Sequence, residues 1–210
     1  MKATLTQLAT LCQTIYTDST DWDQYWTSDD VVVGLKGDVL VLRGSLTAED
    51  WARDAAGFPI WHTGLGFVHA GFIAGMDDVL SEVSKAVVNP IITGHSLGGA
   101  RARLLAGLFA YNDFECQGVV TFGSPKPAFL NLARLLEKSG MEHTSYRNRN
   151  DIVPTLPLTV PPCFDFVHTE PWTAVDAAPA DTNMEPLRDH SIALYLKAMS
   201  ALDAAPSQIK

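Results

Sequence analysis

The sequence has little of what several classes of protein require. Its 210 residues include only three cysteines, Cys12, Cys116 and Cys163, too few and too scattered for a disulfide framework. No CxxC pair or Cys/His cluster predicts a metal site. Basic residues are scarce, since 15 Lys and Arg stand against 24 Asp and Glu, a net charge of −9. This balance argues against a nucleic-acid partner and against charge-driven docking on anionic lipid.

Long apolar runs are missing as well. Nothing approaches the roughly 18 consecutive apolar residues of a transmembrane helix, or the ~7–15 apolar residues of a secretory signal peptide. Leu5, Leu8, Leu11, Cys12 and Ile15 recur instead at helical spacing, which predicts an amphipathic helix packed on the domain. A cytoplasmic protein is the default expectation, and export by another route stays open.

The remaining composition fits one folded domain spanning residues 1–210, because an apolar fraction of 47% can bury a core. Strands and helices alternate through the middle of the chain, which predicts an α/β fold with a largely parallel sheet. We expect a hairpin over residues 31–45, helices over 72–88, 97–111 and 127–138, and buried strands at 90–93 and 118–122. Residues 164–168 and 172–175 are expected to form a small hairpin.

One motif carries a chemical hypothesis. Residues 91–100 read IITGHSLGGA and contain G-x-S-x-G, centred on Ser96. A strand that turns sharply into a helix at such a motif holds a serine hydroxyl clear of the sheet, provided that its neighbours are small. The pentapeptide alone also occurs by chance in glycine-rich turns. Here an apolar strand precedes it and a helix follows, so we expect Ser96 to be a nucleophile, with the backbone N–H of Leu97 facing the oxyanion.

A serine nucleophile needs a histidine base and an acid that orients it, in the chain order Ser, acid, His for this kind of turn. Three histidines follow Ser96: His143, His168 and His190. His190 is best placed, because it comes after a long loop and before the last helix. Asp151 is the preferred acid, because it follows a strand-like segment. The other acids are Asp113, Glu115, Asp165 and Asp176, which are expected to be solvated, and Asp181 and Asp189, which are weaker rivals.

Six motifs in order resemble the class 3 lipase family, the fungal-lipase-like branch of the α/β hydrolases. They are LRGS (42–45), VHAGF (68–72), TGHSLGGA (93–100), TFGSPKP (121–127), NRNDIVPTLP (148–157) and DHSIALYL (189–196). The resemblance covers roughly residues 30–200. It implies an α/β-hydrolase fold, with a mostly parallel central sheet flanked by helices and a short lid-like segment. It also implies a Ser96–His190–Asp151 triad, a second oxyanion donor at Ser45, and no metal or organic cofactor.

The chain departs from the family in being shorter than the secreted fungal members and in having Lys126 where the motif usually has arginine. These differences put secretion and the natural substrate in doubt, while the chemistry is unaffected.

The segment after Ser45 corresponds to the position of the lid in the related lipases. Residues 48–55 are long enough for about two helical turns, and the segment 46–61 that contains them has five large apolar residues: Leu46, Trp51, Phe58, Ile60 and Trp61. These side chains either meet a neutral lipid interface when a lid opens or simply pack on the core, and the two interpretations have equal weight. Asp54 is expected to hydrogen-bond Ser45 or to cap this segment. Leu156, Leu158 and Val160 are expected to line an acyl pocket, although aliphatic residues near an acid loop are often plain core.

The sequence therefore predicts a serine carboxylester hydrolase acting on acylglycerols or other lipid esters. A phospholipase A1 or an acyltransferase with the same triad is the alternative within this chemistry. A catalytically silent lipase-like binding or signalling module is the alternative from another class, and it is disfavoured because Ser96, Asp151 and His190 are all present.

Overall fold

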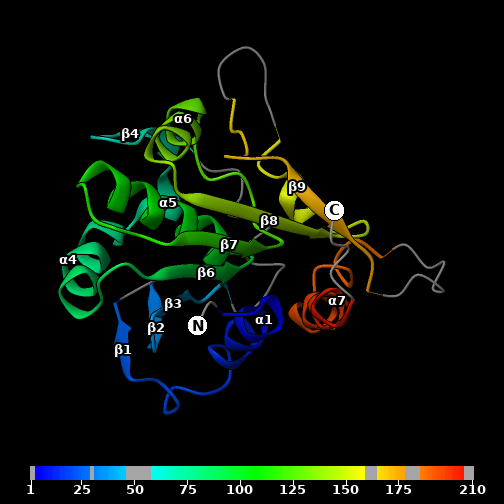
Figure 1. Cartoon of the computed structure of the whole chain (residues 1–210). Coiled ribbons are helices and arrows are strands. Elements are labelled where there is room, and N and C mark those ends of the chain that lie inside the picture. Colours follow the sequence, from blue (N-terminus) through cyan, green and yellow to red (C-terminus); the bar gives the residue numbers. More distant parts are fainter. Residues whose placement is uncertain (1–2, 29–30, 46–57, 159–164, 178–184, 206–210) are drawn as a thin grey trace.

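A computed structural model describes residues 3–28, 31–45, 58–158, 165–177 and 185–205 (Figure 1). Seven strands in these ranges form one sheet, in the spatial order β1-β2-β3-β6-β7-β8-β9. Their bounds are Gln24–Thr27 (β1), Val32–Lys36 (β2), Val39–Leu42 (β3), Ile91–His95 (β6), Gly118–Phe122 (β7), Glu142–Asn148 (β8) and Trp172–Val175 (β9). β1, β2 and β3 pair antiparallel, and every pairing from β3 to β9 is parallel. The predicted mostly parallel sheet is confirmed.

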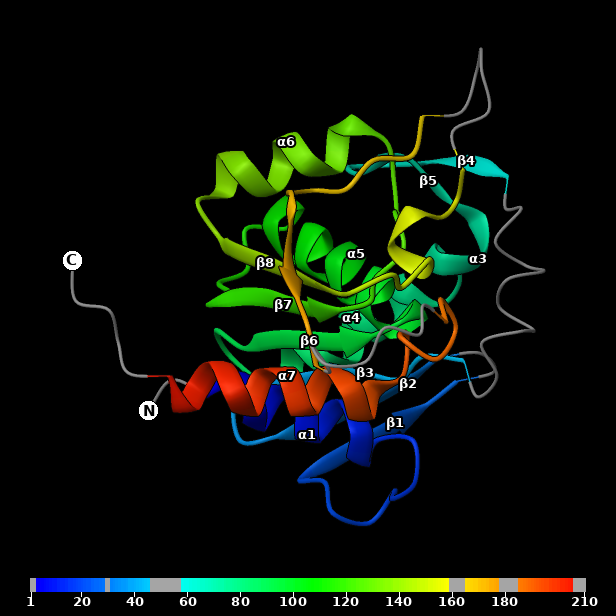
Figure 2. The same ribbon diagram turned by 90° about the vertical axis from the view of Figure 1, so that its right-hand side faces the viewer.

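Helices cover both faces of this sheet. Their bounds are Leu5–Thr14 (α1), Ala70–Ile73 (α3), Met76–Ala86 (α4), Leu97–Tyr111 (α5), Leu130–Ser139 (α6) and Ile192–Ala204 (α7), with a 3-10 turn at Val153–Thr155 (η1). α1 and α7 pack together beneath the sheet, and α4, α5 and α6 lie above it (Figure 2). A separate hairpin of Pro59–His62 (β4) and Gly66–His69 (β5) borders the upper layer.

The central strands are apolar because both of their faces are covered. All residues of β3 and β6 are buried, as expected for strands between two helical layers. One apolar cluster packs α4 and α5 on the upper face, and a second packs α1 and α7 on the lower face. The N-terminal helix is the amphipathic element that its spacing predicted. That residues 1–210 form a single domain stays a prediction.

Two local predictions differ from the structure. The helix expected from Phe72 is interrupted at Gly75, whose φ of +75° is left-handed, so α3 ends before α4 begins. The small hairpin near the end of the chain is wrong. Trp172–Val175 instead pairs with β8 as a parallel edge strand, and Val167 forms an isolated bridge with Ala128. In the described part of the chain, no helix is both long enough and apolar enough to span a membrane.

Candidate active site

Ser96 lies at the sharp turn between β6 and α5. Its φ of +59° and ψ of −131° are strained for a residue with a side chain. Small neighbours make the turn feasible. A Cβ on Gly94 would collide with the carbonyl group of Gly98, and a Cβ on Gly98 would collide with the carbonyl oxygen of Leu42. The strand-turn-helix context that the G-x-S-x-G motif requires is therefore present.

His190 and Asp151 meet Ser96 from two other segments. Asp151 follows β8, and His190 precedes α7. The Nε2 atom of His190 is 2.8 Å from Ser96 Oγ, and its Nδ1 atom is 2.8 Å from Asp151 Oδ2. A carboxylate can only accept hydrogen bonds, so the proton of the neutral ring is on Nδ1 and Nε2 is free to accept from the serine hydroxyl. This arrangement can remove a proton from Ser96 and stabilise the imidazolium that forms.

The carboxylate of Asp151 has further partners and no exposed surface. The backbone N–H of Val153 donates to its Oδ1 at 2.9 Å. The hydroxyl of Tyr195 donates to its Oδ2 at 2.6 Å and accepts the backbone N–H of Asn148 at 3.0 Å. Burial, followed by the charge of Asp151, raises the pKa of Tyr195, so the phenol stays protonated as a donor. Sequence reasoning missed Tyr195, although its polar-tipped ring in the apolar helix after His190 was a usable signal.

A second histidine supports the backbone of the first. His95 Nε2 is 2.8 Å from the carbonyl oxygen of His190, and its Nδ1 is 3.1 Å from the hydroxyl of Tyr16. The carbonyl can only accept, so His95 donates from Nε2 and accepts the Tyr16 proton at Nδ1. Burial and the neighbouring His190 lower the pKa of His95 well below its usual value, which keeps the ring neutral. α1, which carries Tyr16 just beyond its end, thereby reaches the site.

Two glycines permit close approach at the triad. Gly123 has a φ of +58°, and a Cβ there would lie 2.8 Å from Asp151 Oδ2 and 2.9 Å from His190 Nδ1. Gly44 is equally close to the other end of the site, because a Cβ there would lie 3.2 Å from Ser96 Cβ. Neither position has room for a side chain.

The same proximity bears on the two expected oxyanion donors. Ser45 directly follows Gly44 in the segment just beyond β3, which pairs in parallel with β6. Leu97 is the first residue of α5, where backbone N–H groups have no partner within the helix and the helix dipole favours negative charge. Both residues lie close to Ser96 along the chain or across the sheet, and their role as oxyanion donors stays a prediction.

The other candidate histidines and acids lie elsewhere. His143 binds Glu170, and His168 lies between Arg103 and Pro154. Asp189 is adjacent to His190 in the chain, but its Oδ2 accepts from the backbone N–H of Asn150 at 3.4 Å. The candidates Asp113, Glu115 and Asp165 are exposed. Asp181 lies outside the described residues.

The expected lid and acyl-pocket residues are only partly described. Leu46, Trp51, Asp54 and Val160 lie outside the described residues. Phe58 and Trp61 are exposed, at 78% and 63%, so Trp61 does not pack in the core. Leu156 packs against the upper core cluster, whereas Leu158 is 66% exposed. Among the described residues, no three His, Cys, Asp or Glu side chains gather closely enough to hold a metal ion.

Comparison with known sequences gives consistent matches. The model of the family described as "Lipase (class 3)" matches residues 39–160. A lipase of Rhizomucor miehei is 31% identical in an alignment 163 residues long that covers 67% of this chain and 42% of the relative. The secreted mono- and diacylglycerol lipase 1 of Fusarium solani is 30% identical in an alignment 161 residues long that covers 68% of this chain and 45% of the relative. The chain thus spans less than half the length of these two relatives.

Solved structures agree on the fold. The Rhizomucor miehei lipase in its propeptide complex aligns with a TM-score of 0.68 at 22% identity, covering 93% of this chain and 78% of that chain. Lipase II from Rhizopus niveus aligns with a TM-score of 0.64 at 23% identity, covering 82% and 78%. At these identities the likeness shows the fold alone, and it confirms the predicted α/β-hydrolase architecture.

Proposed function

The chain belongs to the class 3 lipase family, and on that premise we propose that it is a serine carboxylester hydrolase that cleaves lipid esters at Ser96. The observation that carries the proposal is the continuous chain of contacts from Ser96 Oγ through the His190 ring to Asp151, with both distances 2.8 Å. The proposed chemistry uses protein side chains, backbone N–H groups and water.

Catalysis begins when Ser96 Oγ attacks the ester carbonyl carbon while its proton moves to His190 Nε2. Asp151 holds the ring in the productive tautomer and stabilises the imidazolium. The Leu97 N–H and the Ser45 N–H or hydroxyl stabilise the tetrahedral oxyanion. The intermediate then collapses: the ester C–O bond breaks, His190 donates the proton to the leaving alcohol, and the acyl group stays on Ser96 Oγ. A water molecule, deprotonated by His190, finally releases the carboxylic acid and restores the Ser96 hydroxyl.

The substrate class follows from the relatives and from an apolar surface. The curated relatives include lipases and mono- and diacylglycerol lipases, so acylglycerols are the first substrates to test. On the β4–β5 hairpin, Ile60, Trp61 and Phe67 are exposed, and Phe58 precedes it with 78% exposure. Burying apolar surface contributes about 25 cal/mol per Å², so these side chains favour transient contact with a neutral lipid surface. Leu158, after the acid turn, is also exposed, at 66%, and we propose that it borders the acyl chain together with Leu156.

Hydrolysis of p-nitrophenyl butyrate, p-nitrophenyl dodecanoate and an emulsified acylglycerol tests the proposal. We expect turnover by the wild type, loss of turnover in Ser96→Ala, and full turnover in Ser200→Ala, which removes an exposed serine of α7. The ratio of turnover on the dodecanoate to turnover on the butyrate separates a lipase from a short-chain esterase. A folded wild type that turns over none of these esters contradicts the proposal and favours a silent lipase-like module.

A further inference from the structure

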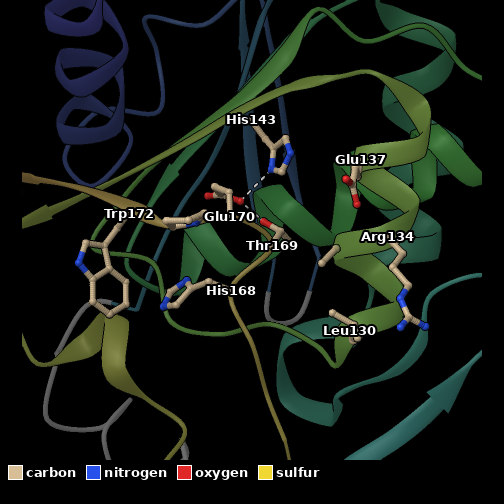
Figure 3. A pocket seen from close by; sticks show the side chains of 10 residues that line it. Leu130, Arg134, Glu137, His143, His168, Thr169, Glu170 and Trp172 are labelled. Carbon is tan, nitrogen blue, oxygen red and sulfur yellow. Dashed lines mark hydrogen bonds and ion pairs between the residues drawn. The ribbon is translucent and has the colours of Figure 1, made fainter.

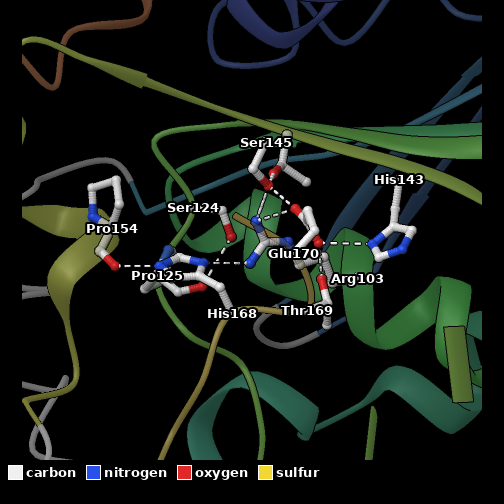
Figure 4. A network of polar contacts seen from close by, with 10 residues as sticks. Arg103, Ser124, Pro125, His143, Ser145, Pro154, His168, Thr169 and Glu170 are labelled. Carbon is white, nitrogen blue, oxygen red and sulfur yellow. Dashed lines mark hydrogen bonds and ion pairs between the residues drawn. The ribbon is translucent and has the colours of Figure 1, made fainter. Parts of the chain in front are cut away.

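A second buried polar network lies between α5 and the sheet, apart from the triad (Figure 4). Its centre is Arg103, which has no exposed surface. One guanidinium nitrogen, Nη2, is 2.9 Å from Glu170 Oε1 and donates to Thr121 Oγ1 at 3.2 Å and to Ser145 Oγ. The other nitrogen, Nη1, is 2.9 Å from His168 Nδ1. The network therefore connects α5, the helix that begins directly after Ser96, to β7, β8 and the segment before β9.

Glu170 anchors the guanidinium as a charged group. Burial opposes its ionisation, but Arg103 and hydrogen bonds from His143, Ser145 and Thr169 outweigh this effect and lower the pKa of Glu170 to about 2. Removing two charges from water is costly, so a buried ion pair is a weak source of stability. Its clearer consequence is geometric, because the fixed fork of the guanidinium determines where His168 can lie.

The contacts of His168 fix its tautomer. Arginine can only donate, so Nδ1 of His168 accepts from Arg103 and Nε2 carries the proton. That Nε2–H donates to the carbonyl oxygen of Pro154 at 2.5 Å. Burial and the charge of Arg103 lower the pKa of His168 to about 4, so the ring is neutral at ordinary pH. The ring thus connects a buried cation to one particular backbone carbonyl.

That carbonyl belongs to the turn that holds the catalytic acid. Pro154 is the second residue of η1, directly after Val153, whose N–H donates to Asp151 Oδ1 at 2.9 Å. A second side chain contacts the same turn, since Arg147 Nε donates to the carbonyl oxygen of Asp151 at 2.9 Å. The ring of Trp172 lies against both side chains, 4.9 Å from the Arg147 guanidinium and 4.9 Å from the His168 ring.

The outer side of this network is open. A pocket of ≈ 740 Å³ lies between α6 and residues 168–172, with His143, Glu170 and Trp172 on its wall (Figure 3). On this side residues 168–170 border the pocket, and on the inner side they are held by the polar contacts with Arg103, Ser145 and Pro154.

We infer that His168 is a positioning residue for catalysis: through the Pro154 carbonyl it fixes the turn that holds Asp151 against His190. The expected effect on turnover rests on the proposed function. The expected effect on the His190–Asp151 contact does not depend on it. Loss of the Pro154 contact lets the turn relax, and the imidazolium of His190 loses part of its carboxylate partner.

Two matched substitutions separate this role from general packing. His168→Asn retains an amide oxygen for Arg103 but is too short to reach Pro154. His168→Gln can accept from Arg103 and also donate to Pro154. The readout is the pH midpoint at which the His190 ring titrates, followed by NMR, together with kcat and KM for p-nitrophenyl butyrate.

We expect the His190 midpoint in His168→Asn to fall below that of the wild type, because the imidazolium loses part of the carboxylate that stabilises it. We expect kcat to fall roughly 10- to 100-fold with little change in KM, because small misplacements at a site have effects of this size. His168→Gln should return both quantities toward the wild type. Glu170→Gln should also lower the His190 midpoint and kcat, because it removes the carboxylate that anchors Arg103.

His143→Gln is the control. It alters a histidine of the same network that binds Glu170 and does not contact the acid turn. It should lower the thermal midpoint and leave the His190 midpoint unchanged. A wild-type His190 midpoint in folded His168→Asn, or in folded Glu170→Gln, would overturn the inference. Because the NMR midpoint needs no turnover, a wild type without esterase activity refutes the proposed function and leaves this test intact.

Discussion

The hydroxyl of Tyr195 offers a sharp test of how the acid of the site is held. Tyr195→Phe removes one oxygen from a side chain with no exposed surface and leaves the ring in place. Two contacts are lost together: the donation to Asp151 Oδ2 at 2.6 Å and the acceptance of the Asn148 N–H at 3.0 Å. The substitution therefore affects the carboxylate and a buried backbone donor without making a large cavity.

The expected loss of stability follows from these two contacts. A hydrogen bond to a charged group contributes about 1.5–3 kcal/mol, and a buried donor left unpaired costs about 1–3 kcal/mol. The two effects overlap, so we expect the free energy of unfolding to fall by about 2–4 kcal/mol. For a domain of this size the thermal midpoint then falls by roughly 4–16 °C.

Unlike the loss of Ser96, His190 or Asp151, the loss of the Tyr195 hydroxyl is not expected to abolish turnover. Tyr195 and His190 both donate to Oδ2, so removing the phenol leaves more of the carboxylate charge for the imidazolium. We expect turnover to persist and the acid limb of kcat/KM to move to higher pH. Urea unfolding and a pH–rate profile measure the two effects, with Tyr111→Phe at the exposed end of α5 as the control. Unchanged stability, or an acid limb that moves to lower pH, would show that the Tyr195 hydroxyl does not act on Asp151 in this way.

Three further substitutions or conditions test other parts of the site. Ser45→Ala should lower kcat roughly 100- to 1000-fold with KM nearly unchanged if its hydroxyl contacts the oxyanion; an unchanged kcat contradicts that role. Gly123→Ala should lower turnover by roughly 100-fold, because its Cβ would lie 2.8 Å from Asp151 Oδ2. Gly140→Ala, at a φ of +71° in open space, is its control for backbone strain and should keep full activity. Acid should destabilise the protein through His168, which faces the charged groups Arg103, Glu170 and Lys126 and whose pKa falls from 6.5 to about 4 on folding. The unfolded chain binds the extra proton in that interval, so stability is full above about pH 6.5 and falls by up to roughly 3 kcal/mol as the pH drops toward 4. Urea unfolding at pH 7 and pH 4.5 should show a smaller fall in His168→Gln than in the wild type, and equal falls would contradict this assignment.

The elements that could be predicted from the sequence are those that depend on residues close together in the chain. The sharp turn at Ser96 is one of them. It was predicted from the apolar strand before Ser96, the helix after it and the small residues around it, because the G-x-S-x-G motif requires this backbone geometry. His190 was preferred over His143 and His168 because it lies in a loop before a helix, and the structure brings it to Ser96. Asp151 was preferred for a similar reason, and it meets His190.

The sequence could not reveal contacts made between distant segments. Trp172–Val175 looked like half of a hairpin because its alternation is that of any short strand, while its true partner, β8, lies some distance back along the chain. The Arg103–Glu170 pair was invisible for the same reason, because a lone arginine in a helix is usually solvated. Tyr16 and Tyr195 reach the site from the first and last helical regions, and only the packed fold brings their hydroxyls there.

Covalent labelling with a fluorophosphonate probe reports on the Ser96 nucleophile itself. Peptide mapping by mass spectrometry after labelling identifies the modified residue and its stoichiometry. We expect one adduct per chain, on Ser96, at a rate that collapses in a His190→Ala variant because the hydroxyl loses its base. An adduct on another serine, or a folded protein that takes up no probe, would contradict this expectation.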